Sequence, residues 1–251
     1  MILHTATGYL YFRDIHVVEY ESVVGFRGWC IIDNRVLAGI GCYGRYIYQL
    51  MGRPGAMARV PIVEPEAVTD PVVEEIFAWV TEMEGSVPNH FYLELNFPEY
   101  MRAKLQSTAI LWEEGELSMP EIQHVGIAVS TANGCAYCTG AFCTILDYGL
   151  DAETAYVREF AERGIEVLDD DRLEAIVEYA LTVNDDPHAI TDADIETLRD
   201  VGLGDRGIVQ LTHLVSDFAS YNRLNTALDT DYDYQEMWRT LEAVRTTPAG
   251  E

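Results

Sequence analysis

The sequence predicts an all-α protein, with a helical domain over residues 57–251 and a short β-rich or disordered extension over residues 1–56. Three observations support this prediction. After residue 57, apolar side chains recur at helical spacing between capping and stop signals. Strand signals are almost absent from the same region. The 251 residues are 49% hydrophobic and 23% charged, which is ordinary for a chain that buries its own core.

The extension differs from the rest of the chain in charge and composition. Residues 1–56 contain four acidic residues and five arginines, whereas the whole chain has 42 acidic and 16 basic residues. They also hold eight of the 19 glycines, and residues 30–37 have a β-like pattern. Residues 1–56 are therefore either a genuine β-rich extension or sequence translated upstream of a natural start at Met57. The change in charge favours the second interpretation, in which Cys30 and Cys42 take no part in function.

Two helices are expected in the first half of the helical domain. One follows Pro98 and ends near Gly115, and a single face of it carries Met101, Leu105, Thr108 and Trp112. The other begins at a capping box formed by Ser118 and Glu121, with Pro120 in its first turn, and stops at residues 133–134.

Five more helices are expected after residue 134. The first starts at the cysteines and ends at Gly149, because glycine readily adopts the left-handed conformation that ends helices. An amphipathic stretch covers residues 173–181, and a capped helix covers residues 191–202. A long helix spans residues 205–228, and a last helix surrounds Trp238. No repeat or long linker interrupts these segments, so residues 57–251 are expected to form one domain.

The net charge of −26 limits the partners of the protein. Such a chain repels phosphate backbones and anionic bilayers, so neither a nucleic acid nor a membrane is an expected partner. Fifteen of the 16 basic residues are arginines, and Lys104 is the one lysine. This composition is typical of a cytoplasm with multi-molar salt, where carboxylates keep a protein hydrated and salt screens their repulsion. The sequence therefore predicts a halophilic protein in which single acidic residues say little about function.

The chain is expected to be cytoplasmic. No apolar run reaches the length of a spanning helix, and the first residues lack the pattern of a signal peptide. Five cysteines, an odd number at low density, do not indicate a disulfide framework. They indicate thiol chemistry or burial instead.

Cys135 and Cys138 form a CxxC pair on the expected first turn of a helix. Unpaired backbone N–H groups and the helix dipole favour a thiolate there. An unperturbed thiol is only ~3% ionised at pH 7, and a helix terminus worth roughly 0.3 to 1 kcal/mol raises this to ~5–14%. The helix alone therefore does not make an efficient nucleophile. A zinc site with Cys143 lacks a fourth ligand and the right spacing, so no metal is expected, and Cys143 is interpreted as a buried structural thiol.

Residues 127–138, with the sequence IAVSTANGCAYC, resemble the signature of the alkylhydroperoxidase D-like branch of the carboxymuconolactone decarboxylase superfamily. The resemblance extends over about residues 57–230. Segments similar to those of the branch's peroxidase-related members are found at residues 57–61, 87–89, 98–99, 186–192 and 221–225.

This resemblance implies an all-helical fold that assembles as a trimer or hexamer. It also implies that Cys138 attacks the O–O bond of a hydroperoxide as a thiolate and becomes a sulfenic acid, which Cys135 resolves as a disulfide. A lipoylated or thioredoxin-like protein is then expected to reduce the disulfide. No cofactor is expected.

The chain departs from the family pattern at two positions. Family peroxidases carry a glutamate twelve residues before the first motif cysteine and a histidine four residues after the second, which together relay a proton. Here these positions are Gln123 and Phe142, and neither side chain exchanges a proton near neutral pH. His124 is the candidate replacement acid or base, although a shift of one residue turns a helical side chain by about 100°.

Three functional hypotheses remain. The first is a thiol-dependent peroxidase, or disulfide oxidoreductase, that reduces hydroperoxides through Cys138 and Cys135. The second is a non-redox enzyme similar to carboxymuconolactone decarboxylase that acts on a small cyclic substrate, for which the CxxC pair would be dispensable. The third is a redox sensor that forms the disulfide without turnover, which Gln123 and Phe142 favour.

Overall fold

A computed structural model describes residues 3–5, 8–10, 16–21, 27–32, 58–63 and 69–239, with side chains for 58–63 and 69–239. The chain divides into two compact units, Met1–Gly55 and Ala56–Glu251. In the first unit, β1 (Leu3–Thr5) pairs antiparallel with β2 (Gly8–Leu10), and β3 (His16–Glu21) pairs antiparallel with β4 (Arg27–Ile32). These hairpins agree with the β-like pattern of the sequence. Cys42 lies outside the described residues, and the interpretation of residues 1–56 as upstream sequence stays a prediction.

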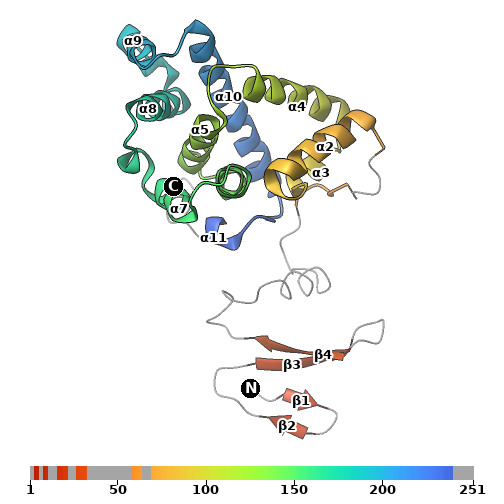
Figure 1. The fold of residues 1–251 in the computed structure, drawn as a ribbon. Coiled ribbons are helices and arrows are strands. Elements are labelled where there is room, and N and C mark those ends of the chain that lie inside the picture. The colour runs from red at the N-terminus through yellow and green to blue at the C-terminus, as the bar shows by residue number, and fades with distance from the viewer. Residues whose placement is uncertain are drawn as a thin grey trace. The chain divides into compact units, whose positions relative to one another are not determined.

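The described part of the second unit is helical and contains no strand, which confirms the all-α prediction (Figure 1). Its elements are α2 (Pro71–Glu84), α3 (Asn89–Glu94), α4 (Pro98–Glu113), α5 (Met119–Ala132), α6 (Ala136–Thr144), the π-helical turn η2 (Ile145–Gly149), α7 (Thr154–Arg163), η3 (Gly164–Val167), α8 (Asp171–Asp185), η4 (Pro187–Ala189), α9 (Asp192–Asp200), α10 (Asp205–Leu228) and α11 (Glu236–Arg239). None of the helices in this described part is long and apolar enough to cross a membrane.

Helix α5 lies at the centre of the unit and packs against α6, α8 and α10 (Figure 1). It begins at the predicted capping box: the Glu121 N–H donates to the Ser118 hydroxyl, and the Ser118 N–H donates to Glu121 Oε2 at 2.6 Å. Every residue from Ile122 to Ser130 is buried. A helix that is buried on all sides can serve as the axis of the core.

The expected helix over residues 135–149 differs from the observed one in its last turn. Helix α6 ends at Thr144, and the chain continues as the π-helical turn η2. Gly149 lies so close to α2 that a Cβ at this position would come within 2.5 Å of the Met83 carbonyl oxygen. Because the π-helical turn is wider and Gly149 has no side chain, η2 packs closely against the end of α2.

The apolar side chains form two clusters. The larger gathers residues from α5 to α11, and the smaller consists of Val73, Val80, Phe91, Met101 and Leu105 from α2, α3 and α4. The site described below lies where these clusters meet.

Gln210 of α10 ties α10 to the loop between α4 and α5. Its Oε1 accepts hydrogen bonds from the backbone N–H groups of Glu116 and Leu117 at 2.7 and 3.0 Å. Its Nε2 donates to the Leu111 carbonyl at 2.6 Å. The Gln210 side chain is buried, and it supplies the acceptor for the buried N–H of Leu117.

Replacing Gln210 with methionine is expected to lower the free energy of unfolding by about 2–4 kcal/mol, because the buried N–H of Leu117 and the part-buried N–H of Glu116 lose their acceptor. Chemical denaturation followed by circular dichroism measures this change. Gln106→Met, at an exposed position of α4, is the control and should shift the free energy by less than about 0.5 kcal/mol. Equal effects of the two substitutions would contradict the role given to Gln210.

Candidate active site

The two motif cysteines lie together at the start of α6. Cys135 is the N-cap residue, and its Sγ accepts a hydrogen bond from the Cys138 N–H at 3.3 Å. Gly134, with a φ of 66°, makes the tight turn from α5 into α6. Both thiols are reduced, and the two residues are only 2% and 3% exposed.

Asparagines of α10 hold this turn in place. Asn222 accepts a hydrogen bond from Asn133 Nδ2 at 2.8 Å and donates one to the Ser130 hydroxyl at 2.9 Å. One turn further on, Asn225 Nδ2 donates to Cys138 Sγ at 3.4 Å. The end of α5 and the start of α6 are thus bonded to the same face of α10.

The two thiols affect each other's ionisation. The hydrogen bond from Cys138 lowers the pKa of the Cys135 thiol. Burial, together with the same contact to Cys135, raises the pKa of the Cys138 thiol, and the bond from Asn225 opposes that rise. The pair therefore accommodates one negative charge, shared through the proton between the two sulfurs, and resists a second.

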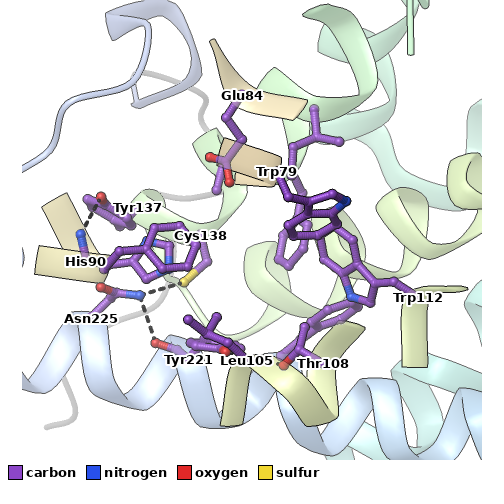
Figure 2. A pocket seen from close by; sticks show the side chains of 15 residues that line it. Trp79, Glu84, His90, Leu105, Thr108, Trp112, Tyr137, Cys138, Tyr221 and Asn225 are labelled. Carbon is purple, nitrogen blue, oxygen red and sulfur yellow. Dashed lines mark hydrogen bonds between the residues drawn. The ribbon is translucent and has the colours of Figure 1, made fainter. Parts of the chain in front are cut away.

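Cys138 lines a cavity of about 60 Å³, and Cys135 is not among the described residues that line it. One water needs roughly 10–15 Å³ on this measure, so the cavity admits a small molecule or the reactive end of a larger one. Five helices and the η2 turn contribute to its walls. Seven Trp, Phe and Tyr side chains dominate these walls, as Figure 2 shows in part: Trp79, Phe91, Trp112, Tyr137, Phe142, Phe218 and Tyr221.

A few polar groups interrupt the aromatic walls. Tyr137 accepts a hydrogen bond from the His90 backbone N–H at 3.1 Å and donates to Asp233 Oδ1 at 2.8 Å. Burial lowers the pKa of His90 to about 3, so its ring is neutral at physiological pH. Glu84 also reaches the cavity, and burial raises the pKa of this carboxyl to about 8.

The two positions that lack the family's relay residues have become part of the packed interior. Gln123 is fully buried, and its Nε2 lies 3.5 Å from the sulfur of Met119. Phe142 lines the cavity and packs on Phe218, with ring centroids 4.6 Å apart. A Cβ at Gly126 would come within 2.5 Å of the Phe142 ring, so the aromatic side chain occupies the space beside α5. The relay positions offer Cys138 no titratable group.

The structure does not bring His124 to the cavity, contrary to its predicted role as replacement acid or base. Its Nδ1 lies 2.6 Å from the Pro120 carbonyl, and its Nε2 lies 2.8 Å from the Tyr156 hydroxyl. Its ring packs against Phe160 of α7 at a centroid distance of 4.7 Å. The physical reason is the rotation of about 100° per residue, which turns position 124 towards α7 when position 123 faces the core. His124 therefore has a structural role here.

Cys143 is fully buried, and burial raises the pKa of its thiol, which fits a structural thiol. No cluster of three or more histidine, cysteine or acidic side chains suited to a metal is found within the described residues. Glu84 and His90, which both line the cavity, were not predicted from the sequence. His90 directly follows the segment 87–89 that resembles the family, whereas nothing in the sequence distinguishes Glu84 from the 41 other acidic residues.

The helical unit is similar to several solved structures. An alkylhydroperoxidase AhpD core, an uncharacterized peroxidase-related protein from Ralstonia eutropha JMP134, is 24% identical over 74% of this chain and 96% of its own, with a TM-score of 0.64. An uncharacterized peroxidase-related protein from Silicibacter sp. TM1040 is 22% identical over 76% of this chain and 98% of its own, with a TM-score of 0.63. A cysteine-to-alanine variant of the debrominase Bmp8 in complex with 2,3,4-tribromopyrrole is 16% identical over 75% of this chain and 96% of its own, with a TM-score of 0.59.

No protein-family model matches the chain, and neither does any curated protein. At these identities, the similar structures establish the fold. The helical unit has the alkylhydroperoxidase D-like fold, which confirms the resemblance found in the sequence at the level of architecture.

Replacing Asn225 with leucine is expected to raise the apparent pKa of the thiol pair by about one unit or more, because a thiolate on Cys138 loses a hydrogen-bond donor. The ultraviolet absorbance of the thiolate, followed against pH, measures this shift. Thr212→Val is the control, since Thr212 lies on the same helix but bonds to Tyr179. An unchanged titration curve in Asn225→Leu would contradict the contact to Cys138.

Proposed function

We propose that the helical unit is a thiol-dependent peroxidase that reduces organic hydroperoxides through Cys138 and Cys135. The observation that carries the proposal is that Cys138 lines a partly open cavity, while the Cys135 sulfur, outside the cavity wall, accepts a hydrogen bond from the Cys138 N–H. A substrate in the cavity meets one sulfur first. That sulfur then has the second within reach for a disulfide.

The first step oxidises Cys138. Its thiolate attacks the terminal oxygen of the hydroperoxide, the O–O bond breaks, and the electron pair of that bond leaves with the alkoxide. The alkoxide takes up a proton and becomes an alcohol, while Cys138 becomes a sulfenic acid. The Cys135 thiol then attacks the Cys138 sulfur and displaces water, which leaves a disulfide between the two residues.

The shared charge of the pair suits this sequence of steps. Transfer of the proton from Cys138 to Cys135 places the negative charge on the sulfur that faces the cavity. It also leaves Cys135 as the thiol that the second step requires. The hydrogen bond from Asn225 to Cys138 stabilises the charge in that position.

The cavity walls favour organic hydroperoxides over hydrogen peroxide. Aromatic side chains gain free energy when they exclude water and contact an apolar substrate. Hydrogen peroxide offers no apolar surface, so the walls give it no such advantage. A hydroperoxide with a flat or branched hydrocarbon group is the substrate class that these walls suit.

A dithiol must reopen the disulfide. A lipoylated or thioredoxin-like protein is the proposed reductant. Its dithiol can reduce the Cys135–Cys138 disulfide by two successive thiol–disulfide exchanges and is itself oxidised to a disulfide. The protein is further proposed to be cytoplasmic, halophilic and a homo-oligomer, as a trimer or hexamer. Exposed apolar side chains on and beside α4 support a subunit contact there: Phe97, Tyr100 and Ile110.

Reductive dehalogenation is a second candidate, favoured by the aromatic walls of the cavity and by the similarity to a debrominase. The same dithiol would supply two electrons, so that an aryl bromide and two thiols give the arene, a disulfide and hydrogen bromide. The decarboxylase-like and redox-sensor hypotheses remain as alternatives in which peroxide is not turned over.

Cys138→Ser is expected to abolish consumption of cumene hydroperoxide by the full chain in multi-molar KCl with dihydrolipoamide as reductant, because the serine hydroxyl is not a nucleophile at neutral pH. Cys135→Ser should stop turnover after one oxidation and leave a sulfenic acid that dimedone traps at Cys138. Loss of peroxide, followed by a colorimetric assay, measures the first effect, and mass spectrometry measures the second.

Cys143→Ser is the matched control and should consume peroxide at the wild-type rate, because Cys143 is buried outside the cavity wall. Wild-type chain that is no faster than Cys138→Ser would contradict the peroxidase. Release of bromide from a bromopyrrole in the same assay would then support the dehalogenase, and a disulfide that forms without turnover would support the sensor.

A further inference from the structure

The cavity contains a carboxyl group that the mechanism above does not use. Glu84 is the last residue of α2, and its side chain enters the cavity with the carboxyl on the side where Tyr137 and Cys138 lie (Figure 2). Its Oε2 accepts a hydrogen bond from the Tyr234 hydroxyl at 2.6 Å. The second oxygen, Oε1, is not used by this bond. The carboxyl is thus held by one oxygen and can present the other to a bound molecule.

Three features of its surroundings disfavour the charged form of Glu84. Glu84 is half-buried beside aromatic side chains, and the loss of water around its carboxyl raises its pKa most. Asp233 adds a nearby negative charge. The carboxyl also stands at the C-terminus of α2, where the helix dipole is negative. The hydrogen bond from Tyr234 opposes these effects, and the resulting pKa of about 8 leaves Glu84 mostly protonated at pH 7.

We propose that Glu84 is the general acid that protonates the leaving alkoxide when Cys138 cleaves the hydroperoxide. This inference rests on the proposed peroxidase function. The step balances as follows: the Cys138 thiolate and the hydroperoxide give a sulfenic acid and an alkoxide, and the Glu84 carboxyl transfers its proton to the alkoxide. The products are an alcohol and a Glu84 carboxylate, which regains its proton from solvent. A carboxyl on α2 would thereby replace the relay that Gln123 and Phe142 have lost.

The other polar groups in the cavity wall are poorly suited to this step. His90 has a pKa of about 3, so the acidic imidazolium form is almost absent at pH 7 and the N–H of the neutral ring is far too weak an acid. The Tyr137 hydroxyl already donates a hydrogen bond to Asp233, and burial raises the pKa of Tyr137. Burial likewise raises the pKa of Tyr221. Efficient acid catalysis needs a pKa near the working pH, and among the described lining residues Glu84 meets that requirement.

The charged and titratable groups around Glu84 fix the expected pH dependence. Asp233 and Tyr234 face it from the segment after α10, Tyr137 and Cys138 from α6, and His90 from α3. Tyr148 of η2 packs against the neighbouring Gly85. The rate of Cys138 oxidation should rise with pH while the thiol pair ionises, and it should fall again as Glu84 loses its proton above about pH 8.

Glu84→Gln is expected to slow the oxidation of Cys138 by cumene hydroperoxide about 100-fold at pH 7, because the amide has no acidic proton. Rapid quench of the reduced full chain, followed by mass spectrometry from pH 6 to about 10, measures this single turnover. Glutamine keeps an acceptor for the Tyr234 hydroxyl, so the packing is preserved. Glu82→Gln, at an exposed position of the same helix, is the matched control and should react at the wild-type rate.

Tyr234→Phe is a second variant, for which the direction of the shift in the pH profile can be predicted. Loss of its hydrogen bond removes the contact that lowers the pKa of Glu84, so the fall in rate should move to higher pH. A merely structural role for Glu84 would leave the position of this fall unchanged.

The outcomes separate the two proposals. Cys138-dependent oxidation that proceeds equally fast in wild type and Glu84→Gln, with the same pH profile, would overturn the role of Glu84 and leave the peroxidase intact. Absence of Cys138 oxidation in the wild-type chain would overturn the peroxidase and, with it, the acid. Slow oxidation in Glu84→Gln, together with the shift in Tyr234→Phe, would support both.

Discussion

The hydrogen bonds between α10 and the turn that joins α5 to α6 are the interaction on which the site depends. Asn222 bonds to Ser130 and Asn133 at the end of α5, and Asn225 bonds to the sulfur of Cys138 in α6. Side-chain amides in a buried setting have fixed geometry, because an unpaired group there costs free energy. The same contacts therefore position the thiol pair and bring α10 to the cavity, to which it contributes Phe218 and Tyr221.

Burial acts on this site in two opposite ways. It raises the pKa of Cys138, which disfavours the nucleophile, and it raises the pKa of Glu84, which favours an acid near neutral pH. The thiol pair reduces the first cost by sharing one charge between two sulfurs. Phe142 offers the cavity an apolar ring where a histidine would offer polar groups, and Glu84 of α2 supplies a carboxyl to the cavity wall. A dry aromatic cavity with a protonated acid is a consistent arrangement for apolar hydroperoxides.

Local signals predicted much of the fold. The capping box of α5 and the thiol pair at the start of α6 were predicted at the correct residues, because both depend on short-range hydrogen bonding. The cavity was not predictable, since its walls come from segments between residues 79 and 225 and no local pattern encodes their meeting. The same limit applies to two residues near the site. His124 was chosen for its place in the sequence but faces α7, and Glu84 was hidden among many surface carboxylates.

The central claim is that Cys138 and Cys135 together deliver two electrons to a hydroperoxide bound in the aromatic cavity. Mass spectrometry of the reduced full chain after one equivalent of cumene hydroperoxide, with no reductant present, tests it most directly. The account predicts one disulfide between Cys135 and Cys138 and one equivalent of cumyl alcohol, formed faster than the disulfide that an equal concentration of hydrogen peroxide produces. Peroxide that remains unconsumed, or oxidation at Cys143 in place of the pair, would contradict the account.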